Sequence, residues 1–275
     1  MIERNLPVDE IEIRLLFEAI YLRFHYDFRS YSMASLKRRV AAALAALSIE
    51  NVSALQERLM HKPETFAQLL QYLTVQVSDM FRDPEFFKTF RTQIVPELAT
   101  YPSLKFWIAG CSSGEEAYSF AIALEEEGLL DRTMIYATDI NPLALEKAEA
   151  GIYDQGRIPS FVENHAASGG KAPLAEYYTA AYEGAIFKRS LRSHIVFADH
   201  SLATDTVFAE VHLVSCRNVL IYFDRALQTR ALGLFRSALT RRGYLGLGAR
   251  EALFGSPHGQ AFREIQGGTK WYQRW

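Results

Sequence analysis

Cysteine is scarce in this chain, and so are long apolar runs and an excess of charge of either sign. Two cysteines in 275 residues cannot form a disulfide framework, so a reducing compartment, the cytoplasm, is the expected location. No stretch reaches the roughly 18 consecutive apolar residues of a membrane helix, and the first residues, MIERNLPVDE, are not expected to be a signal peptide. The formal net charge of −2 gives no overall field for nucleic acid. We therefore expect no membrane insertion and no nucleic-acid partner.

The first 95 residues predict an all-helical domain. Four stretches have the composition and spacing of helices: 11–24, 33–47, 53–60 and 64–73. The apolar face of the second helix leaves Lys37 and Arg38 toward solvent, and Arg39 follows them. This basic run has two interpretations, a solvated helix face or a docking patch for an acidic partner.

The stretch LKFWIAGCSSGEE, residues 104–116, predicts a buried strand, a turn of small residues and the start of a helix. This is the opening unit of a doubly wound α/β sheet, where ligands lie beyond the carboxyl ends of strands. Glu115 and Glu116 stand at the helix start, where they would repel a phosphate and attract a cation. S-adenosylmethionine has no phosphate and carries a positive charge, so it is favoured over a dinucleotide, and the chain also lacks GxGxxG.

A second strand is expected at 134–140, and it ends in an acid, Asp139. This acid lies about 25 residues beyond the small-residue turn, near the spacing at which an acidic residue binds ribose hydroxyls. Asp139 could equally cap the following helix, 142–149. Its pairing with the first turn favours the ligand interpretation.

Two further segments stand out. The polar loop 76–83 precedes a predicted helix start at Asp83-Pro84-Glu85, but a helix cap leaves Gln76, Ser78 and Arg82 unexplained. Between residues 155 and 195 the alternation of strands and helices breaks, and a β-hairpin turning at Glu183-Gly184 is expected. Later strands are predicted at 195–197, 211–215, 243–248 and 270–272.

Taken together, the motifs make the chain similar to the CheR-type chemoreceptor glutamate O-methyltransferases. The similar segments are SLKRR, VSDMFRDPEFF, AGCSSGEEAYS, YATDIN, SCRNVLIYFD and GYLGLGAREAL. The resemblance implies an α/β protein with an N-terminal helical domain, 1–95, and a Rossmann-like S-adenosylmethionine-dependent methyltransferase domain, 96–275. A small β-subdomain is inserted at 155–195. The usual strand order, 3-2-1-4-5, would place Cys111 and Cys216 at the ends of neighbouring strands.

The resemblance also implies which residues form the site. The family's cofactor contacts fall on Gln76, Ser78, Arg82, Glu115, Glu116, Asp139, Ser201, Leu202, Cys216, Arg217 and Asn218. Arg82 and Tyr222 match the residues nearest the transferred methyl group and are the catalytic candidates. Asp139 should hold the ribose hydroxyls, and Ser201 and Leu202 should flank the adenine. No metal is expected, because no histidine and cysteine cluster has the spacing of metal ligands.

The chain departs from the family pattern at four places. The family usually has asparagine at Gln76, threonine at Ser78, and asparagine or aspartate at Ser201, where serine shortens the reach of the side chain. The histidine-serine pair that usually precedes Glu251 is replaced by Ala249-Arg250.

The implied partner is the helical cytoplasmic region of a chemoreceptor, docked on Lys37, Arg38 and Arg39. Some family members also tether a peptide at the receptor's C-terminal tail. The hairpin after Tyr177-Tyr178 is shorter here, so we predict no tail tether. Two alternatives stay open, a methyltransferase for another acceptor and a degenerate S-adenosylmethionine-binding module. The second is disfavoured because the chain retains Arg82, Glu116, Asp139, Asn218 and Tyr222.

Overall fold

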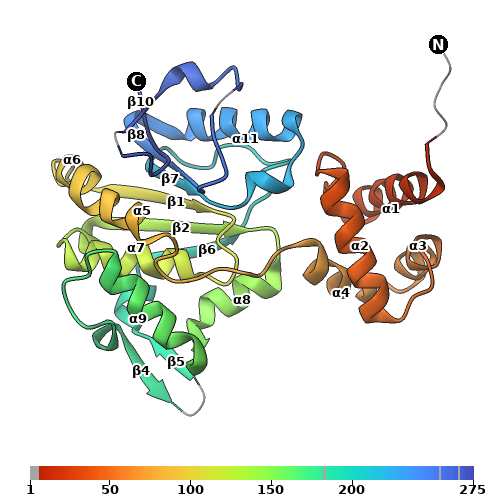
Figure 1. Cartoon of the computed structure of the whole chain (residues 1–275), viewed down its shortest axis with the longest axis horizontal. Coiled ribbons are helices and arrows are strands. Elements are labelled where there is room, and N and C mark those ends of the chain that lie inside the picture. Colours follow the sequence, from red (N-terminus) through yellow and green to blue (C-terminus); the bar gives the residue numbers. More distant parts are fainter. Residues whose placement is uncertain (1–5, 182–183, 254, 266) are drawn as a thin grey trace. The chain divides into compact units, whose positions relative to one another are not determined.

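A computed structural model of the chain describes residues 6–181, 184–253, 255–265 and 267–275 (Figure 1). The described residues form two compact units. The first contains the described residues up to Val75 together with two later segments, Leu202–Thr204 and Tyr222–Arg230. The second contains the described residues of Gln76–Ser201, Asp205–Ile221 and Ala231–Trp275.

The first unit is helical up to Val75, whereas the sequence predicted a helical domain of residues 1–95; residues 76–95 belong to the second unit. Its helices in the described part of the chain are α1 (Val8–Phe24), α2 (Met33–Leu47), α3 (Val52–His61) and α4 (Glu64–Leu73). Each helix buries apolar side chains, among them Leu16 of α1, Val40 of α2 and Leu69 of α4. Asn51 is the N-cap of α3, and its side-chain oxygen accepts a hydrogen bond from the N–H of Ala54 at 2.8 Å.

The later segment Tyr222–Arg230 is part of this first unit. The N–H of Ser32 donates to the carbonyl of Tyr222 at 2.9 Å. The rings of Tyr31 and Phe223 meet edge to face with their centroids 4.9 Å apart. The helical unit is therefore completed by residues from far along the chain.

The second unit is built on a seven-stranded sheet of described residues, in the order β6-β2-β1-β7-β8-β10-β9. The strands are β1 (Leu104–Ala109), β2 (Thr133–Asp139), β6 (Ile195–Asp199), β7 (Val211–Cys216), β8 (Leu239–Leu247), β9 (Phe262–Glu264) and β10 (Trp271–Arg274). The first five in that order are parallel, and β10 runs antiparallel to both its neighbours. Counted along the chain, the order is 3-2-1-4-5-7-6, which confirms the predicted 3-2-1-4-5. The order reverses between β1 and β7, where ligands of such sheets bind.

Helices cover both faces of this sheet. They are α5 (Pro84–Thr89), the π-helix η1 (Phe90–Ile94), α6 (Val95–Leu98), α7 (Glu115–Glu126), α8 (Pro142–Ala150) and α11 (Arg225–Ala238). Successive strand residues point to opposite faces, so Phe106 and Trp107 of β1 mark the two layers. Phe106 packs against Phe90 of η1 and Phe120 of α7, each with ring centroids 6.0 Å apart. Trp107 packs against Phe235 of α11 at 5.4 Å.

The predicted inserted β-subdomain is confirmed as a small antiparallel sheet in the order β3-β5-β4. Its elements are β3 (Ile152–Asp154), η3 (Gln155–Arg157), α9 (Ile158–Ala167), η4 (Leu174–Tyr177), β4 (Tyr178–Ala181), β5 (Gly184–Phe187) and α10 (Arg189–Arg192). Strands β4 and β5 pair from Tyr178 opposite Phe187 to Ala181 opposite Gly184. Glu183 of the predicted turn lies outside the described residues.

Three details differ from the sequence-based expectations. Helix α5 begins at Pro84, but Asp83 has a left-handed backbone (φ 56°) and its side chain does not cap the helix, so the predicted acidic cap is wrong. Strand β8 begins at Leu239, directly after α11, and not at Gly243. Strand β9 was not predicted, because three residues give too short a pattern to recognise. No helix of the described residues combines the length and the hydropathy needed to cross a membrane.

Candidate functional site

In the turn after β1, backbone N–H groups form hydrogen bonds with backbone carbonyls of the protein. The N–H groups of Gly110 and Cys111 both bind the carbonyl of Thr138, at 2.8 and 2.9 Å, and that of Gly114 binds the carbonyl of Cys111 at 3.0 Å. Phosphate-binding turns of nucleotide sites instead present free N–H groups to the ligand. The turn is therefore poorly suited to a pyrophosphate, as the sequence predicted.

The glycines of this turn serve packing and backbone shape. Gly110 has φ +74°, and a Cβ there would lie 2.5 Å from a methyl carbon of Val219. Gly114 has φ +91°, and a Cβ there would lie 2.8 Å from that of Ala148. At both positions protein atoms occupy the space that a larger side chain would need.

Asp139 lies at the end of β2 and is held in one orientation. One carboxylate oxygen accepts the N–H of Ser112 at 2.8 Å, and the other accepts the N–H of Asn141 at 3.0 Å. Burial raises the pKa of Asp139 above its ordinary value, the backbone hydrogen bonds oppose this, and the Asp199 carboxylate adds to the rise. Asp199 is the register partner of Asp139 on β6. The result is a fixed acceptor at the carboxyl edge of the sheet.

Glu115 and Glu116 open α7, and each is engaged by an arginine. Glu116 accepts from the Ser215 hydroxyl at 2.6 Å and from Arg217 at 2.9 Å. Glu115 is fully buried and pairs with Arg157 at 2.7 Å. The prediction that Glu115 is available to a cationic ligand is therefore wrong, because its charge is already neutralised inside the protein.

Arg217 fixes the end of the polar loop. Its buried guanidinium donates to the carbonyl of Arg82 at 2.6 Å and to the carboxylate of Asp83 at 2.8 Å. It also lies 4.0 Å from the centroid of the Phe86 ring. Arg217 was expected to line the cofactor site, but its side chain is occupied in holding the backbone at Arg82.

The side chain of Arg82 itself is half-buried. Its guanidinium forms neither an ion pair nor a hydrogen bond with any residue that the structure describes. Its backbone is fixed while its charge stays uncompensated, so Arg82 can bind an incoming carboxylate.

The remaining predicted residues of the second unit lie at strand ends or in the loop. Gln76 accepts from the Ser112 hydroxyl at 3.4 Å, which brings it next to the residue that binds Asp139. The N–H of Ser201 donates to Asp205 at 2.9 Å. Ser78 and Asn218 are half-buried. Within the described chain no group of three histidine, cysteine or acidic side chains could hold a metal ion.

Cys111 and Cys216 lie at the ends of β1 and β7, as predicted, because Ile108 pairs with Ser215 in the sheet. Both thiols are buried and free. Burial raises both pKa values well above the ordinary range, so neither is a nucleophile at neutral pH.

Tyr222 and Leu202 belong to the first unit. There Arg39 lies 4.2 Å from the centroid of the Tyr222 ring and donates to the carbonyl of Leu73. Burial lowers the pKa of Arg39, and the Tyr222 side chain partly opposes this. The prediction that Arg39 belongs to an exposed basic patch is wrong, because only 6% of it is exposed. Arg38 is exposed, and Lys37 pairs with Asp9 at 2.7 Å.

One supporting residue was not recognised from the sequence. Glu251, which is buried, accepts the N–H groups of Asn218, Val219, Leu220 and Gly248 at 2.7–2.9 Å. It thereby shapes the loop after β7, where Asn218 adopts φ 61°. The sequence signals were an acid three residues after Gly248 and its place in the segment GYLGLGAREAL, and neither revealed which groups Glu251 binds.

Comparison with known proteins gives matches over both parts of the chain. The model of the "CheR methyltransferase, all-alpha domain" matches residues 11–74, and that of the "CheR methyltransferase, SAM binding domain" matches residues 76–269. A protein of Pseudomonas putida named "Putative methyltransferase Cher3" is 57% identical over 263 residues, 96% of this chain and 95% of that protein.

Several relatives are named as chemotaxis enzymes, among them the following two. "Chemotaxis protein methyltransferase Cher2" of Pseudomonas putida is 30% identical and aligns over 76% of this chain and 78% of its own. "Chemotaxis protein methyltransferase" of Listeria monocytogenes is 28% identical over 82% of this chain and 84% of its own. The predicted resemblance and the predicted cofactor are both confirmed. The chain belongs to the CheR methyltransferase family and is an S-adenosylmethionine-dependent methyltransferase of the chemotaxis type.

Proposed function

We propose that the protein transfers a methyl group to glutamate side chains on the cytoplasmic helical region of a chemoreceptor, giving glutamate methyl esters. The observation that carries this proposal is Arg82, whose backbone is held by Arg217 and whose guanidinium has no partner among the described residues, in the loop next to the carboxyl edge of the sheet. A guanidinium binds a carboxylate acceptor through hydrogen bonds between opposite charges, which it cannot form with a neutral amine or hydroxyl acceptor.

The residues present fit S-adenosylmethionine. Asp139 is oriented to accept the ribose hydroxyls, and the turn that would bind a phosphate is closed by its own hydrogen bonds. We assign the remaining contacts to Gln76, Ser78, Glu116, Ser201, Leu202, Cys216 and Asn218. Arg217 acts on the cofactor loop through the backbone at Arg82.

The bound cofactor supplies a methyl group on a positively charged sulfur. The acceptor glutamate has an ordinary pKa near 4.3, so it is already ionised at neutral pH and no general base is required. The task of the protein is positioning, which brings the reacting atoms to about 3–3.5 Å. Arg82 is assigned to orient the acceptor carboxylate, and Tyr222 stays the second catalytic candidate, on the resemblance alone.

We assign receptor docking to two basic side chains of α2, the half-buried Lys37 and the exposed Arg38. Lys37 is already paired with Asp9, so Arg38 is the stronger candidate. A receptor substrate places the enzyme in the cytoplasm, where that region of the receptor lies. The prediction that no tail peptide is needed stays a prediction, since Glu183 of the hairpin turn lies outside the described residues.

The proposal is tested by incubating the protein with labelled S-adenosylmethionine and receptor cytoplasmic fragments, and then mapping base-labile methyl esters. With the wild-type enzyme, we expect the label on glutamate side chains of the receptor fragments. Arg82→Ala should lower turnover more than it weakens binding of S-adenosylhomocysteine. Label that resists base, or is absent from receptor fragments, would contradict the glutamate ester.

A further inference from the structure

The loop 76–83 is held at both ends by arginines. Arg217 binds its far end, at Arg82 and Asp83. Its near end is bound by Arg157, which comes from η3 at the start of the inserted subdomain. Arg157 donates to the carbonyl of Ser78 and approaches the carboxylate of Asp79 at 3.5 Å.

Arg157 is itself anchored by a buried charge. Its other terminal nitrogen donates to Glu115 at 2.7 Å, and Glu115 also accepts the hydroxyl of Ser113 at 2.8 Å. A buried carboxylate requires a partner of opposite charge, and here that partner is Arg157. The planar guanidinium binds Glu115 and Ser78 in a fixed relative geometry, which a lysine could not do.

Helix α9 extends this support along the loop. The side-chain amide of Asn164 donates to the carbonyl of Met80 at 3.0 Å. The ring of His165 lies 4.8 Å from that of Phe81, centroid to centroid. Phe81 has an unusual φ of 50°, and its N–H is bound by the Ser119 hydroxyl at 2.9 Å. Two contacts from α9 and one from α7 therefore hold the backbone that leads to Arg82.

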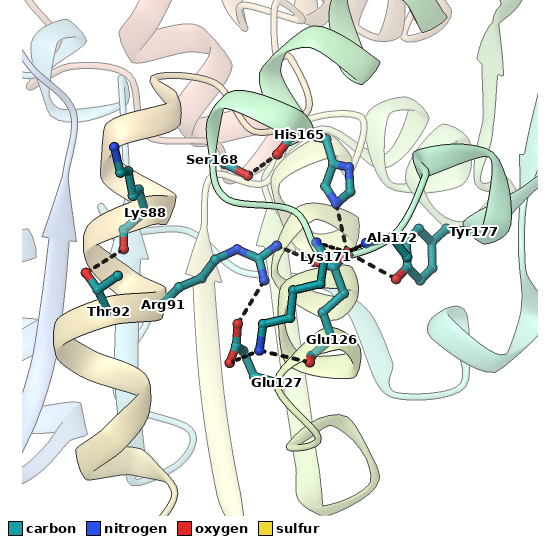
Figure 2. A network of polar contacts seen from close by, with 10 residues as sticks. All are labelled: Lys88, Arg91, Thr92, Glu126, Glu127, His165, Ser168, Lys171, Ala172 and Tyr177. Carbon is teal, nitrogen blue, oxygen red and sulfur yellow. Dashed lines mark hydrogen bonds and ion pairs between the residues drawn. The ribbon is translucent and has the colours of Figure 1, made fainter.

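The far end of α9 is fastened to α7 (Figure 2). One oxygen of Glu126 accepts hydrogen bonds from the ring of His165, the Tyr177 hydroxyl and the N–H groups of Lys171 and Ala172, at 2.9–3.2 Å. Arg91 of η1 neutralises Glu126 and Glu127. Helix α9 is thus bound both to α7, through Glu126, and to the loop, through the carbonyl of Met80.

We propose that Arg157 is a positioning residue for methyl transfer, acting through Glu115 and the Ser78 carbonyl to set the loop that carries Ser78 and Arg82. The inserted subdomain is then a scaffold for the catalytic loop, besides any role in binding partners. This inference rests on the proposed function of the loop residues. The two adjacent acids at the start of α7 each anchor one of the arginines that bind the loop: Glu115 pairs with Arg157, and Glu116 pairs with Arg217.

The test compares Arg157→Gln and Arg157→Lys with Arg192→Gln. Arg192 is a suitable control because it also forms a salt bridge, with Glu149 at 2.8 Å, but on the exposed surface. Amide hydrogen exchange of the peptide containing 76–83, binding of S-adenosylhomocysteine, and kcat and KM for receptor are measured on the full chain.

We expect Arg157→Gln to speed exchange of the loop amides, to weaken S-adenosylhomocysteine binding by about tenfold or more and to lower kcat, since a charge-assisted hydrogen bond is lost. The KM for receptor should change little. For Arg157→Lys, the exchange rate, the affinity and kcat should lie between those of the wild type and Arg157→Gln. Arg192→Gln should match the wild type in all three. Unchanged exchange and unchanged binding in Arg157→Gln would overturn the proposal.

Glu115→Gln provides a second route if Arg157→Gln fails to fold, because it removes the charge that anchors Arg157 and keeps the size of the side chain. The proposal requires that this variant also exchange faster in the loop 76–83. Loop exchange does not depend on the reaction. If the wild type methylates no receptor, the proposed function fails, while the exchange data still decide whether Arg157 holds the loop.

Discussion

At the scale of single residues, Asp139 combines a fixed orientation with a raised pKa. Asp139→Ala should weaken binding of S-adenosylhomocysteine by about 1.5–3 kcal/mol, the range for hydrogen bonds to charged groups. In the wild type the affinity should also fall as the pH drops through the raised pKa, because protonation removes the acceptor. Calorimetry across pH tests both points, and an Asp139→Asn variant with the same pH profile as the wild type would contradict the assignment.

Arg38 and Arg39 are neighbours with opposite environments, and their variants form a matched pair. Arg39→Gln removes the partner of the Leu73 carbonyl and the contact with Tyr222. Leaving a buried carbonyl unpaired costs about 1–3 kcal/mol, so thermal unfolding should occur at a lower temperature. Arg38→Gln should leave stability within about 0.5 kcal/mol and raise only the KM for receptor. Equal unfolding temperatures for the two variants would refute this distinction.

The sequence predicted the chemical type of the site residues better than their partners. Asp139 could be chosen as a candidate because an acid after a strand has a characteristic spacing from the first turn. Glu115 was misjudged because Arg157, which neutralises it, lies 42 positions along the chain. Arg39 was misjudged because its burial comes from Leu73 and Tyr222, and no local pattern reveals such distant neighbours.

At the scale of elements, Glu126 controls how the inserted subdomain is attached. Burial raises the pKa of Glu126, but the His165 hydrogen bond, the charge of Arg91 and the N–H groups of Ala172 and Lys171 outweigh it and bring the pKa to about 2. A lowered pKa means that the stabilisation is complete above the ordinary pKa of 4.5 and is lost as the pH falls toward 2.

We therefore expect Glu126→Gln to be less stable than the wild type at pH 7, with a difference that shrinks as the pH falls through 4.5 toward 2. Unfolding in denaturant at several pH values measures this. Glu149→Gln, at an exposed ion pair, is the control and should show no comparable trend. A constant difference between Glu126→Gln and the wild type would show that the charge of Glu126 is not what matters.

Elements were predictable where local patterns were strong. Strands β1, β2 and β7 are apolar blocks followed by small or polar residues, and the sequence placed all three. The start of β8 could not be found, because Leu239 follows α11 without a turn residue and pairs with Val211 ahead of a register shift. Asp83 was given a cap role since acids before proline commonly cap helices, but its carboxylate binds Arg217 instead.

At the scale of the whole molecule, the first unit is not a continuous stretch of chain. A fragment of residues 1–75 lacks Tyr222 and Phe223, and so loses the contacts that these make with Arg39 and Tyr31. We expect this fragment to unfold with low cooperativity in urea. Adding a peptide of residues 220–231 should raise its midpoint. Circular dichroism measures both, and a sharp transition unaffected by the peptide would argue against the need for the later segment.

The split composition of the first unit also has a consequence for synthesis and for evolution. The ribosome releases the N-terminal helices long before the segment Tyr222–Arg230 that joins them. The N-terminal helices therefore stay incompletely packed until the ribosome has synthesised the segment Tyr222–Arg230. Recombination of genes at the codon for Val75 would separate two stretches that fold together. A functional hybrid of two such enzymes should arise only when both coding segments are inherited from the same parent.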